Sequence, residues 1–304
     1  QLFQIQQTPC DVQFQSFQIV GGDLYLNFQK MTLPEVKFDL IQQKMSSKEY
    51  NAACFFGNCL VCCSESQYVD FFFQNKLVRQ IKFQTPLKSI CVHENTIFVG
   101  GCKNDLFAIQ FENDANDVNA QIRISKSIYQ REIANFKFTA LLYHENILFA
   151  ADSTGIVHLF GFLNGQFIKI TQIDAKMVVF CSIIYNNEIY IGGTQGVCVI
   201  NPHYNPIHLL CQKYFNKELQ NFKIADILSC QKDLQSFHPE KLCDFRHVYQ
   251  NAEDGSCNAL FCDESLFGGF DSGFKVNILS HKREFVSNSG VLAGCSSMTV
   301  GGGR

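Results

Sequence analysis

Four stretches of the chain repeat one order of short strands and polar turns. They are SICVHENTIFVGGCKNDLFAIQF (89–111), ALLYHENILFAADSTGIVHLFGF (140–162), SIIYNNEIYIGGTQGVCVINP (182–202) and ALFCDESLFGGFDSGFKVNIL (259–279). In each stretch, apolar residues alternate with a period of two, which predicts β-strands rather than helices. Each stretch therefore predicts three strands, and its second strand ends in two small residues. These small pairs are Gly100–Gly101, Ala150–Ala151, Gly192–Gly193 and Gly268–Gly269.

Weaker copies of the same order extend the repeat over nearly the whole chain. Residues 14–28 and 53–73 fit it, residues 290–304 supply its first two strands, and a degenerate copy is expected at 227–237. The first turns recur about every 40 residues, which is the length of a four-stranded propeller blade. Fourth strands are expected at 76–83 and 165–173, and residues 1–6 could close a ring as another.

A single sheet of four strands cannot cover both of its apolar faces, whereas radial stacking of several sheets buries both. A parallel α/β fold would need a helix between strands, and most repeats leave no room for one. We therefore predict an all-β fold, a β-propeller of four-stranded blades. The repeat count predicts seven blades, with six to eight left open. Residues 1–304 are expected to form a single propeller that is a fragment cut at one or both ends.

Composition narrows the class of function. The net charge is −3 without a long basic block, which gives no reason to expect nucleic acid as a partner. No apolar run is long enough for a membrane helix, so no membrane insertion is expected. The 15 cysteines are an odd number scattered through a large chain, which favours a reducing, cytoplasmic setting over a small secreted disulfide scaffold.

The pattern of small residues followed by an Asp/Ser–Gly turn and an alternating strand resembles the WD-repeat β-propeller family. The stretches 147–160 and 264–279 carry the resemblance, with Asp152 and Asp271 near the structural turn aspartate of that family. The chain has no Trp, so the Trp–Asp dipeptide of the family is absent. The residues at or near its expected position are Phe72, Phe160, Asn201 and Asn277.

Motifs that could carry catalysis or metal binding have simpler interpretations here. HENTI (93–97) and HENIL (144–148) lack the second His of a zinc protease and are expected to be hairpin turns. Cys59 and Cys62 should point to opposite faces of one strand as buried core residues. The segment 112–135 is expected to be a solvated loop whose second half could be helical, with a partner-binding loop as the alternative. Residues 203–256, like 112–135, match the repeat poorly. Ordinary loop roles are expected for the histidines of this segment: His203, His208, His238 and His247. We expect no catalytic residue, no cofactor and no metal.

We therefore expect a non-catalytic scaffold that binds peptide or protein partners through its rim loops. The loops between second and third strands would form one rim, and the His-Glu-Asn turns would lie on the opposite rim. The candidate partner-binding residues of the first rim are Lys103, Asn104, Ser153, Thr154, Thr194, Gln195 and Ser272. Two alternatives stay open: a hydrolase similar to the WD-repeat diphthine methylesterases, implied by faint similarity at 6–14 and 152–160, and the N-terminal propeller of a vesicle-trafficking or ciliary coat subunit.

Overall fold

The computed structural model describes the following residues: 12–20, 23–32, 37–44, 49–74, 76–112, 120–127, 136–163, 165–202, 243–263, 265–286, 291–295 and 298–301. Over these residues the chain forms antiparallel sheets of consecutive strands. The first sheet has three strands: β1 (Val12–Val20), β2 (Asp23–Thr32) and β3 (Lys37–Lys44). The last sheet has two: β24 (Val291–Cys295) and β25 (Met298–Gly301).

Five four-stranded sheets, the blades, lie between these two. Blade 1 contains β4 (Tyr50–Phe56), β5 (Cys59–Ser64), β6 (Tyr68–Phe73) and β7 (Lys76–Lys82). Blade 2 contains β8 (Leu87–His93), β9 (Thr96–Gly101), β10 (Leu106–Phe111) and β11 (Ile122–Lys126). Blade 3 contains β12 (Phe138–His144), β13 (Ile147–Asp152), β14 (Ile156–Leu163) and β15 (Gln166–Asp174). Blade 4 contains β16 (Val179–Tyr185), β17 (Glu188–Gly193), β18 (Gly196–Pro202) and β19 (Cys243–Tyr249). Blade 5 contains β20 (Cys257–Asp263), β21 (Ser265–Phe270), β22 (Phe274–Asn277) and β23 (Arg283–Phe285).

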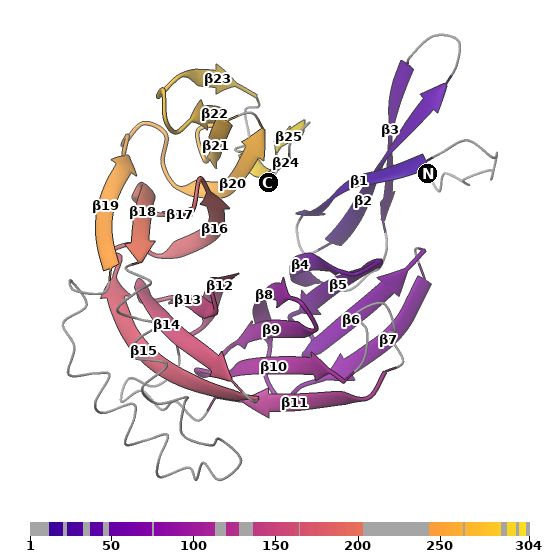
Figure 1. Cartoon of the computed structure of the whole chain (residues 1–304). Coiled ribbons are helices and arrows are strands. Elements are labelled where there is room, and N and C mark those ends of the chain that lie inside the picture. The colour runs from indigo at the N-terminus through magenta and orange to yellow at the C-terminus, as the bar shows by residue number, and fades with distance from the viewer. Residues whose placement is uncertain are drawn as a thin grey trace.

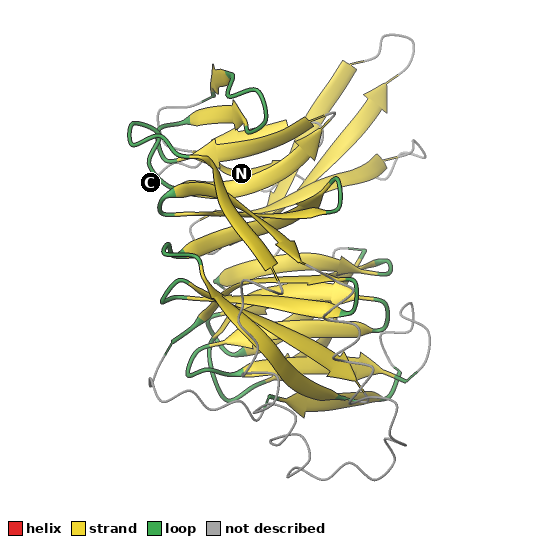
Figure 2. Ribbon diagram, turned by 60° about the vertical axis from the view of Figure 1, so that its left-hand side comes forward, coloured by secondary structure: helices red, strands yellow, loops and turns green. Residues whose placement is uncertain are grey.

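The blades follow one another around a common axis, with the first strand of each innermost (Figure 1). Strands β4, β8, β12, β16, β20 and β24 each contact the next in this order. Figure 2 shows the blades as stacked layers whose connecting loops gather at the two ends of the strands. This arrangement confirms the all-β propeller of four-stranded blades, in which the inner strands of neighbouring blades are in contact.

The predicted number of seven blades, with six to eight open, is wrong, because the residues that the structure describes form five four-stranded blades. The prediction treated every strand–turn–strand copy as one blade. The copy at 14–28 instead belongs to the three-stranded sheet β1–β3, and the copy at 290–304 forms the two-stranded sheet β24–β25. The degenerate copy at 227–237 and the closing strand at 1–6 lie outside the described residues.

The small residues at the end of the second strands let adjacent parts of the propeller approach closely. A Cβ added to Gly100 would lie 2.6 Å from the Cβ of Phe138, in the next blade. A Cβ added to Gly193 would lie 2.0 Å from the carbonyl oxygen of Val178, in the segment that enters the same blade. Atoms this close leave no room for a side chain, which explains why these positions are glycine.

Apolar side chains fill the spaces between blades. One cluster joins blades 1 and 2 around Phe71, Val99 and Ile109, and another joins blades 3 and 4 around Leu159 and Ile191. Phe56 and Phe111 have ring centroids 4.5 Å apart, and Phe71 also contacts Phe111 edge-on. The buried phenylalanines therefore pack in the core between blades, whereas Phe55, Phe73, Phe180 and Phe285 are exposed.

Two segments that match the repeat poorly, 112–135 and 203–256, contain fourth strands that the sequence pattern did not reveal. The described part of 112–135 forms β11, which pairs with β10, so the prediction of a loop with a helical second half is wrong there. Strand β19 pairs with β18 and contains His247, which is therefore not a loop residue. His203, His208 and His238 lie outside the described residues.

Candidate interaction surface

The seven predicted rim residues lie in the loops that join second to third strands, and these loops share one rim because every blade has the same antiparallel strand order. Lys103, Thr154, Thr194 and Gln195 are exposed, whereas Asn104, Ser153 and Ser272 are partly buried. The turns Glu94–Asn95 and Glu145–Asn146 join first to second strands at the opposite rim, as predicted. Glu94 and Glu145 both have φ near 47°, which these tight two-residue turns require.

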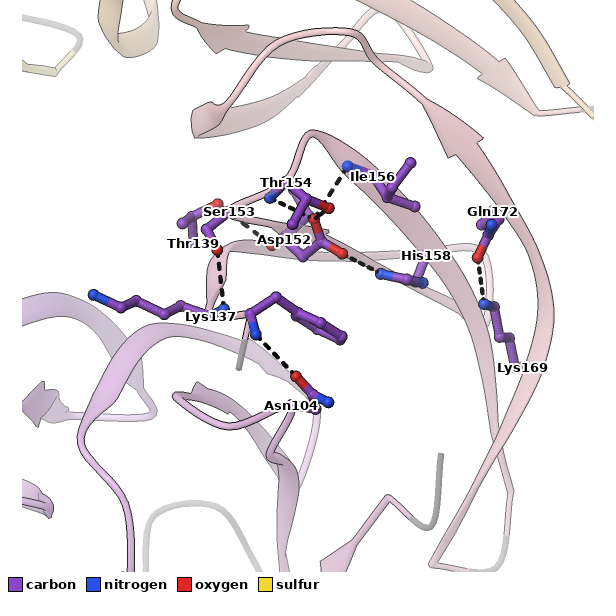
Figure 3. Close-up of polar contacts among 12 residues, drawn as sticks. Asn104, Lys137, Thr139, Asp152, Ser153, Thr154, Ile156, His158, Lys169 and Gln172 are labelled. Carbon is purple, nitrogen blue, oxygen red and sulfur yellow. Dashed lines mark hydrogen bonds and ion pairs between the residues drawn. The ribbon is translucent and has the colours of Figure 1, made fainter. Parts of the chain in front are cut away.

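Paired hydrogen bonds hold the rim loops against the entering segment, which is the stretch of chain that directly precedes the first strand of the same blade. The N–H of Ser153 donates to the carbonyl of Lys137 at 2.8 Å, and its Oγ accepts the Lys137 N–H at 3.1 Å (Figure 3). In the same manner, the N–H of Thr194 donates to the carbonyl of Val178, and Thr194 Oγ1 accepts the Val178 N–H. These loops are therefore fixed, and the Ser153 and Thr194 hydroxyl oxygens already accept hydrogen bonds within the fold.

A third loop repeats this arrangement with a carboxylate. The N–H of Asp271 donates to the carbonyl of Ser256, and Asp271 Oδ2 accepts the Ser256 N–H at 3.2 Å. Asp271, which is exposed, therefore corresponds to the partly buried Ser153 and not to the buried Asp152 with which the sequence pattern grouped it.

The second residue of every inner strand in the blades is displaced by a one-residue β-bulge, which sequence reasoning missed. The register shifts fall between Tyr50 and Ala52 in β4 and at the same place in the other four inner strands. Bulges re-aim side chains and are frequent next to functional sites. The five bulged residues, here called the bulge ring, lie around the axis at the rim of the second-to-third loops: Asn51, Lys88, Thr139, Phe180 and Asn258.

The bulge ring and the rim loops form one surface. The Asn51 side-chain amide donates to Glu65 Oε2 at 3.0 Å, and Lys88 Nζ forms an ion pair with the same carboxylate. Asn258 Nδ2 donates to Asp271 Oδ1 at 2.7 Å. Burial opposes ionisation of Glu65, but the hydrogen bonds from Lys88 and Asn51 outweigh it and lower its pKa. The surface therefore mixes charges of both signs with amides and one exposed aromatic ring, that of Phe180.

A sequence signal for four of these residues exists. A polar residue stands second in strands that are otherwise largely apolar: YNAACFF, LKSICVH, FTALLYH and CNALFCD. Period-two alternation cannot show that such a residue is displaced from the ladder, so the bulges themselves required the structure.

Blade 3 holds a buried polar network next to this rim. His158 Nε2 lies 2.8 Å from Asp152 Oδ2, and Oδ1 accepts hydrogen bonds from the Thr154 hydroxyl and from the N–H groups of Thr154 and Ile156 (Figure 3). Burial opposes ionisation of Asp152, but the hydrogen bonds from His158 and Thr154 dominate and lower its pKa. The network fixes the turn from β13 to β14 and faces the protein interior.

Two other blades bury a carboxylate with different partners. Asp70 in blade 1 accepts hydrogen bonds from the Tyr50 hydroxyl at 2.7 Å and from Gln80 Nε2 at 2.6 Å. Asp254, which precedes blade 5, accepts one from the Tyr249 hydroxyl and one from Ser272 Oγ at 3.1 Å. These contacts hold the blades in the absence of tryptophan. At the expected Trp–Asp positions, Phe72 and Phe160 are buried, and Asn201 and Asn277 donate to Glu188 and Ser265.

The described cysteines and histidines have structural surroundings. Cys59 lies in the core cluster between blades 1 and 2, whereas the equally buried Cys62 faces the opposite side of β5. Cys198 Sγ lies 3.0 Å from His247 Nδ1, but burial raises the Cys198 pKa to about 12. A cysteine nucleophile needs a lowered pKa and access to substrate, so this pair is a packing contact. No cluster of three or more His, Cys, Asp or Glu side chains suited to a metal occurs within the described ranges.

The opposite rim is held by contacts between neighbouring blades. The ring of His93 stacks on that of Tyr143 with centroids 4.2 Å apart, and Tyr143 stacks in turn on Phe98. His144 Nε2 lies 3.1 Å from Asn187 Oδ1. His93 and His144, which end β8 and β12 just before the turns, thus contact the neighbouring blades.

The comparisons with known proteins place this fold among β-propellers. No protein-family model and no curated protein matches the sequence. Among solved structures, the β-propeller domain of Cps50 (Swd1) from Myceliophteria thermophila is similar, with a TM-score of 0.58 and 10% identity, covering 92% of this chain and 89% of that one. Sqt1 from Saccharomyces cerevisiae has a TM-score of 0.55 and 10% identity over 94% of this chain and 78% of its own. The computationally designed Ika8 protein has a TM-score of 0.53 and 11% identity, covering 93% and 91%.

Swd1 and Sqt1 are WD40 β-propeller proteins, so the chain shares the fold of that class. At such low identity the likeness shows the fold alone. The comparisons do not show a similarity to diphthine methylesterases. Within the part of the chain that the structure describes, no helix is long and apolar enough to cross a membrane.

Proposed function

We propose that this chain is a non-catalytic scaffold that binds a protein or peptide partner on the rim formed by the bulge ring and the second-to-third loops. The observation that carries the proposal is the bulge at one position of all five inner strands. The same bulge in every blade brings five side chains of four different kinds around one mouth of the axis. A rigid scaffold that presents variable side chains in this way is suited to recognition.

The fixed loops support this proposal. Their backbone is bonded to the entering segments at Lys137, Val178 and Ser256, so a partner would meet a preorganised surface and ordering costs on binding would be small. Phe180 is 41% exposed and supplies an aromatic anchor of the kind that dominates binding energy at interfaces. Lys103 in blade 2 and Gln195 in blade 4 are exposed on the same rim and can contact a polar partner.

A pair of matched variants tests the proposal. The rim variant carries Lys103→Ala, Phe180→Ala and Gln195→Ala, and the control variant carries Glu94→Ala and Glu145→Ala at the opposite rim. Partners identified with the unaltered chain by cross-linking and mass spectrometry are then measured by titration against both variants. We expect at least tenfold weaker binding to the rim variant and unchanged binding to the control. Equal binding to the rim variant, or loss of binding to the control instead, would contradict the proposal.

The hydrolase alternative is separated by a second measurement on the unaltered chain. A diphthine methylesterase-like activity would release methanol from a methylated diphthine substrate. The scaffold proposal expects no release above the uncatalysed rate, and sustained turnover would overturn it. Cytoplasmic localisation and the alternative of a coat-subunit propeller stay predictions from the sequence.

A further inference from the structure

Two cysteine thiols meet across the interface between blades 4 and 5. Cys181 lies in β16 and is partly exposed, whereas Cys257 begins β20 and is fully buried. Both are free thiols. A Cβ added to Gly192 would lie 2.7 Å from Cys181 Sγ and 2.7 Å from Cys257 Sγ. The two sulfur atoms therefore converge over the same glycine, which leaves them room.

The equivalent place between blades 2 and 3 is occupied by Ser89 and Phe138. A Cβ added to Gly100 would lie 2.4 Å from Ser89 Oγ and 2.6 Å from Phe138 Cβ. Ser89 Oγ donates to the Phe138 carbonyl at 2.8 Å, just as Cys181 Sγ donates to the Cys257 carbonyl at 3.8 Å. Ser89 and Phe138 fill between blades 2 and 3 the place that Cys181 and Cys257 fill between blades 4 and 5. Close packing of neighbouring blades therefore does not require two thiols.

We propose that Cys181 and Cys257 are a redox pair that forms a disulfide between blades 4 and 5 when a peroxide oxidises the protein. The Cys181 sulfur attacks the O–O bond of hydrogen peroxide, which gives a sulfenic acid and one water. The Cys257 sulfur then displaces the sulfenic oxygen as a second water and forms the S–S bond. In total, two thiols lose two protons and two electrons, and one peroxide becomes two waters. A dithiol reductant reverses the reaction by thiol–disulfide exchange.

The surroundings of the two thiols set the order of these steps. Burial, and then the neighbouring Cys181, raise the pKa of Cys257 well above its usual range. A raised pKa leaves little thiolate, and the buried Cys257 is out of reach of solvent, so the partly exposed Cys181 meets peroxide first. Cys257 is then the resolving thiol. The bond would link positions 76 residues apart and so restrict the unfolded chain.

The chain itself supplies the control variants. Cys181→Ser reproduces Ser89, and Cys257→Val reproduces Val179, which begins β16 as Cys257 begins β20. The full chain and both variants are treated with hydrogen peroxide, alkylated, digested and mapped by tandem mass spectrometry. We expect a Cys181–Cys257 linkage in the full chain that disappears on reduction with dithiothreitol. We also expect a thermal midpoint that rises on oxidation in the full chain and in neither variant.

Two results would overturn the proposal. One is a folded chain in peroxide whose Cys181 becomes sulfinic acid, or joins another cysteine, without forming the linkage. The other is a Tm increase on oxidation that persists in Cys181→Ser. If one variant does not fold, the other still tests whether the Cys181–Cys257 bond causes the Tm increase, because each variant lacks one of the two sulfur atoms.

Discussion

His158 Nε2 lies 2.8 Å from Asp152 Oδ2, and both side chains are fully buried. The histidine comes from the third strand of blade 3 and the aspartate from the end of the second, so the contact joins two adjacent strands beneath their turn. Phe136 stacks on the His158 ring with centroids 5.6 Å apart. Blade 3 is therefore held by a polar pair enclosed in aromatic side chains.

Replacement of His158 by leucine should destabilise the protein strongly. The change removes one donor from Asp152 and leaves a buried carboxylate with fewer partners. Breaking a buried pair by removing one partner costs about 3–5 kcal/mol. Urea denaturation of the variant should show this loss in the free energy of unfolding. His144→Leu is the comparison: it loses a side-chain hydrogen bond with Asn187 at the partly exposed opposite rim and should cost only about 0.5–1.5 kcal/mol. Equal losses in the two variants would contradict the prediction.

The stability of the protein should fall in acid, with Asp152 as one contributor. Its folded pKa is lowered, so its contribution is present above the unfolded pKa, which is about 3.9 for aspartate. The contribution is lost as the pH falls through the folded pKa. Free energies of unfolding measured from pH 6 to pH 3 should therefore decrease, and Asp152→Asn should show a smaller decrease below about pH 4. Identical pH profiles for the two proteins would rule out this role of the carboxylate.

Tyr50→Phe should destabilise blade 1 without disturbing its packing. The variant keeps the ring, which lies edge-on to Phe72, and loses the hydroxyl that donates to the buried Asp70 at 2.7 Å. A hydrogen bond to a charged group contributes about 1.5–3 kcal/mol, and that loss is expected in thermal unfolding. Tyr68→Phe, at a partly exposed position in the same blade, is the control and should unfold within about 0.5 kcal/mol of the parent.

The sequence predicted the first three strands of each repeat because they combine period-two alternation with polar turns. It missed β11 because IRISK is short and mostly exposed, and its two alternating isoleucines are too few to stand out as a period-two run. It overcounted the blades because a strand pair looks the same in sequence whether it belongs to a four-stranded sheet or to the smaller sheet β24–β25.

The rim loops were predicted by position, but their internal bonding was not. The local sequences DSTG and GGTQG do not indicate these hydrogen bonds. Ser153 Oγ accepts the N–H of Lys137, and Thr194 Oγ1 accepts the N–H of Val178. Those contacts join residues 16 positions apart and depend on where the entering segment lies. His158 left a signal that could have been read, since it stands alone as a polar residue in the buried third strand of blade 3.

Gly193→Ala should destabilise blade 4 because its new methyl group would meet main-chain atoms. The carbonyl oxygen of Val178 lies 2.0 Å from the added Cβ, and its carbon lies 2.9 Å away. Backbone cannot rotate aside as a side chain can, so we expect a loss of about 1–3 kcal/mol or more. Gln195→Ala, an exposed change two residues further along, should stay within about 0.5 kcal/mol in the same chemical denaturation experiment. A Gly193→Ala variant as stable as Gln195→Ala would show that the entering segment moves freely.

Cys198 should resist alkylation in the folded protein although it touches His247. Its side chain is fully buried and burial raises its pKa to about 12, so almost no thiolate exists at neutral pH. Cys102 lies in a rim loop and is partly exposed. Burial also raises its pKa, but the reagent can reach its thiol, so Cys102 should react before Cys198. Timed treatment with iodoacetamide at pH 7.5, followed by peptide mapping, should show Cys102 modified long before Cys198. Addition of urea above the unfolding midpoint should make the two rates equal. Rapid modification of Cys198 in the folded chain would mean that its contact with His247 activates the thiol, contrary to the structural role assigned to it.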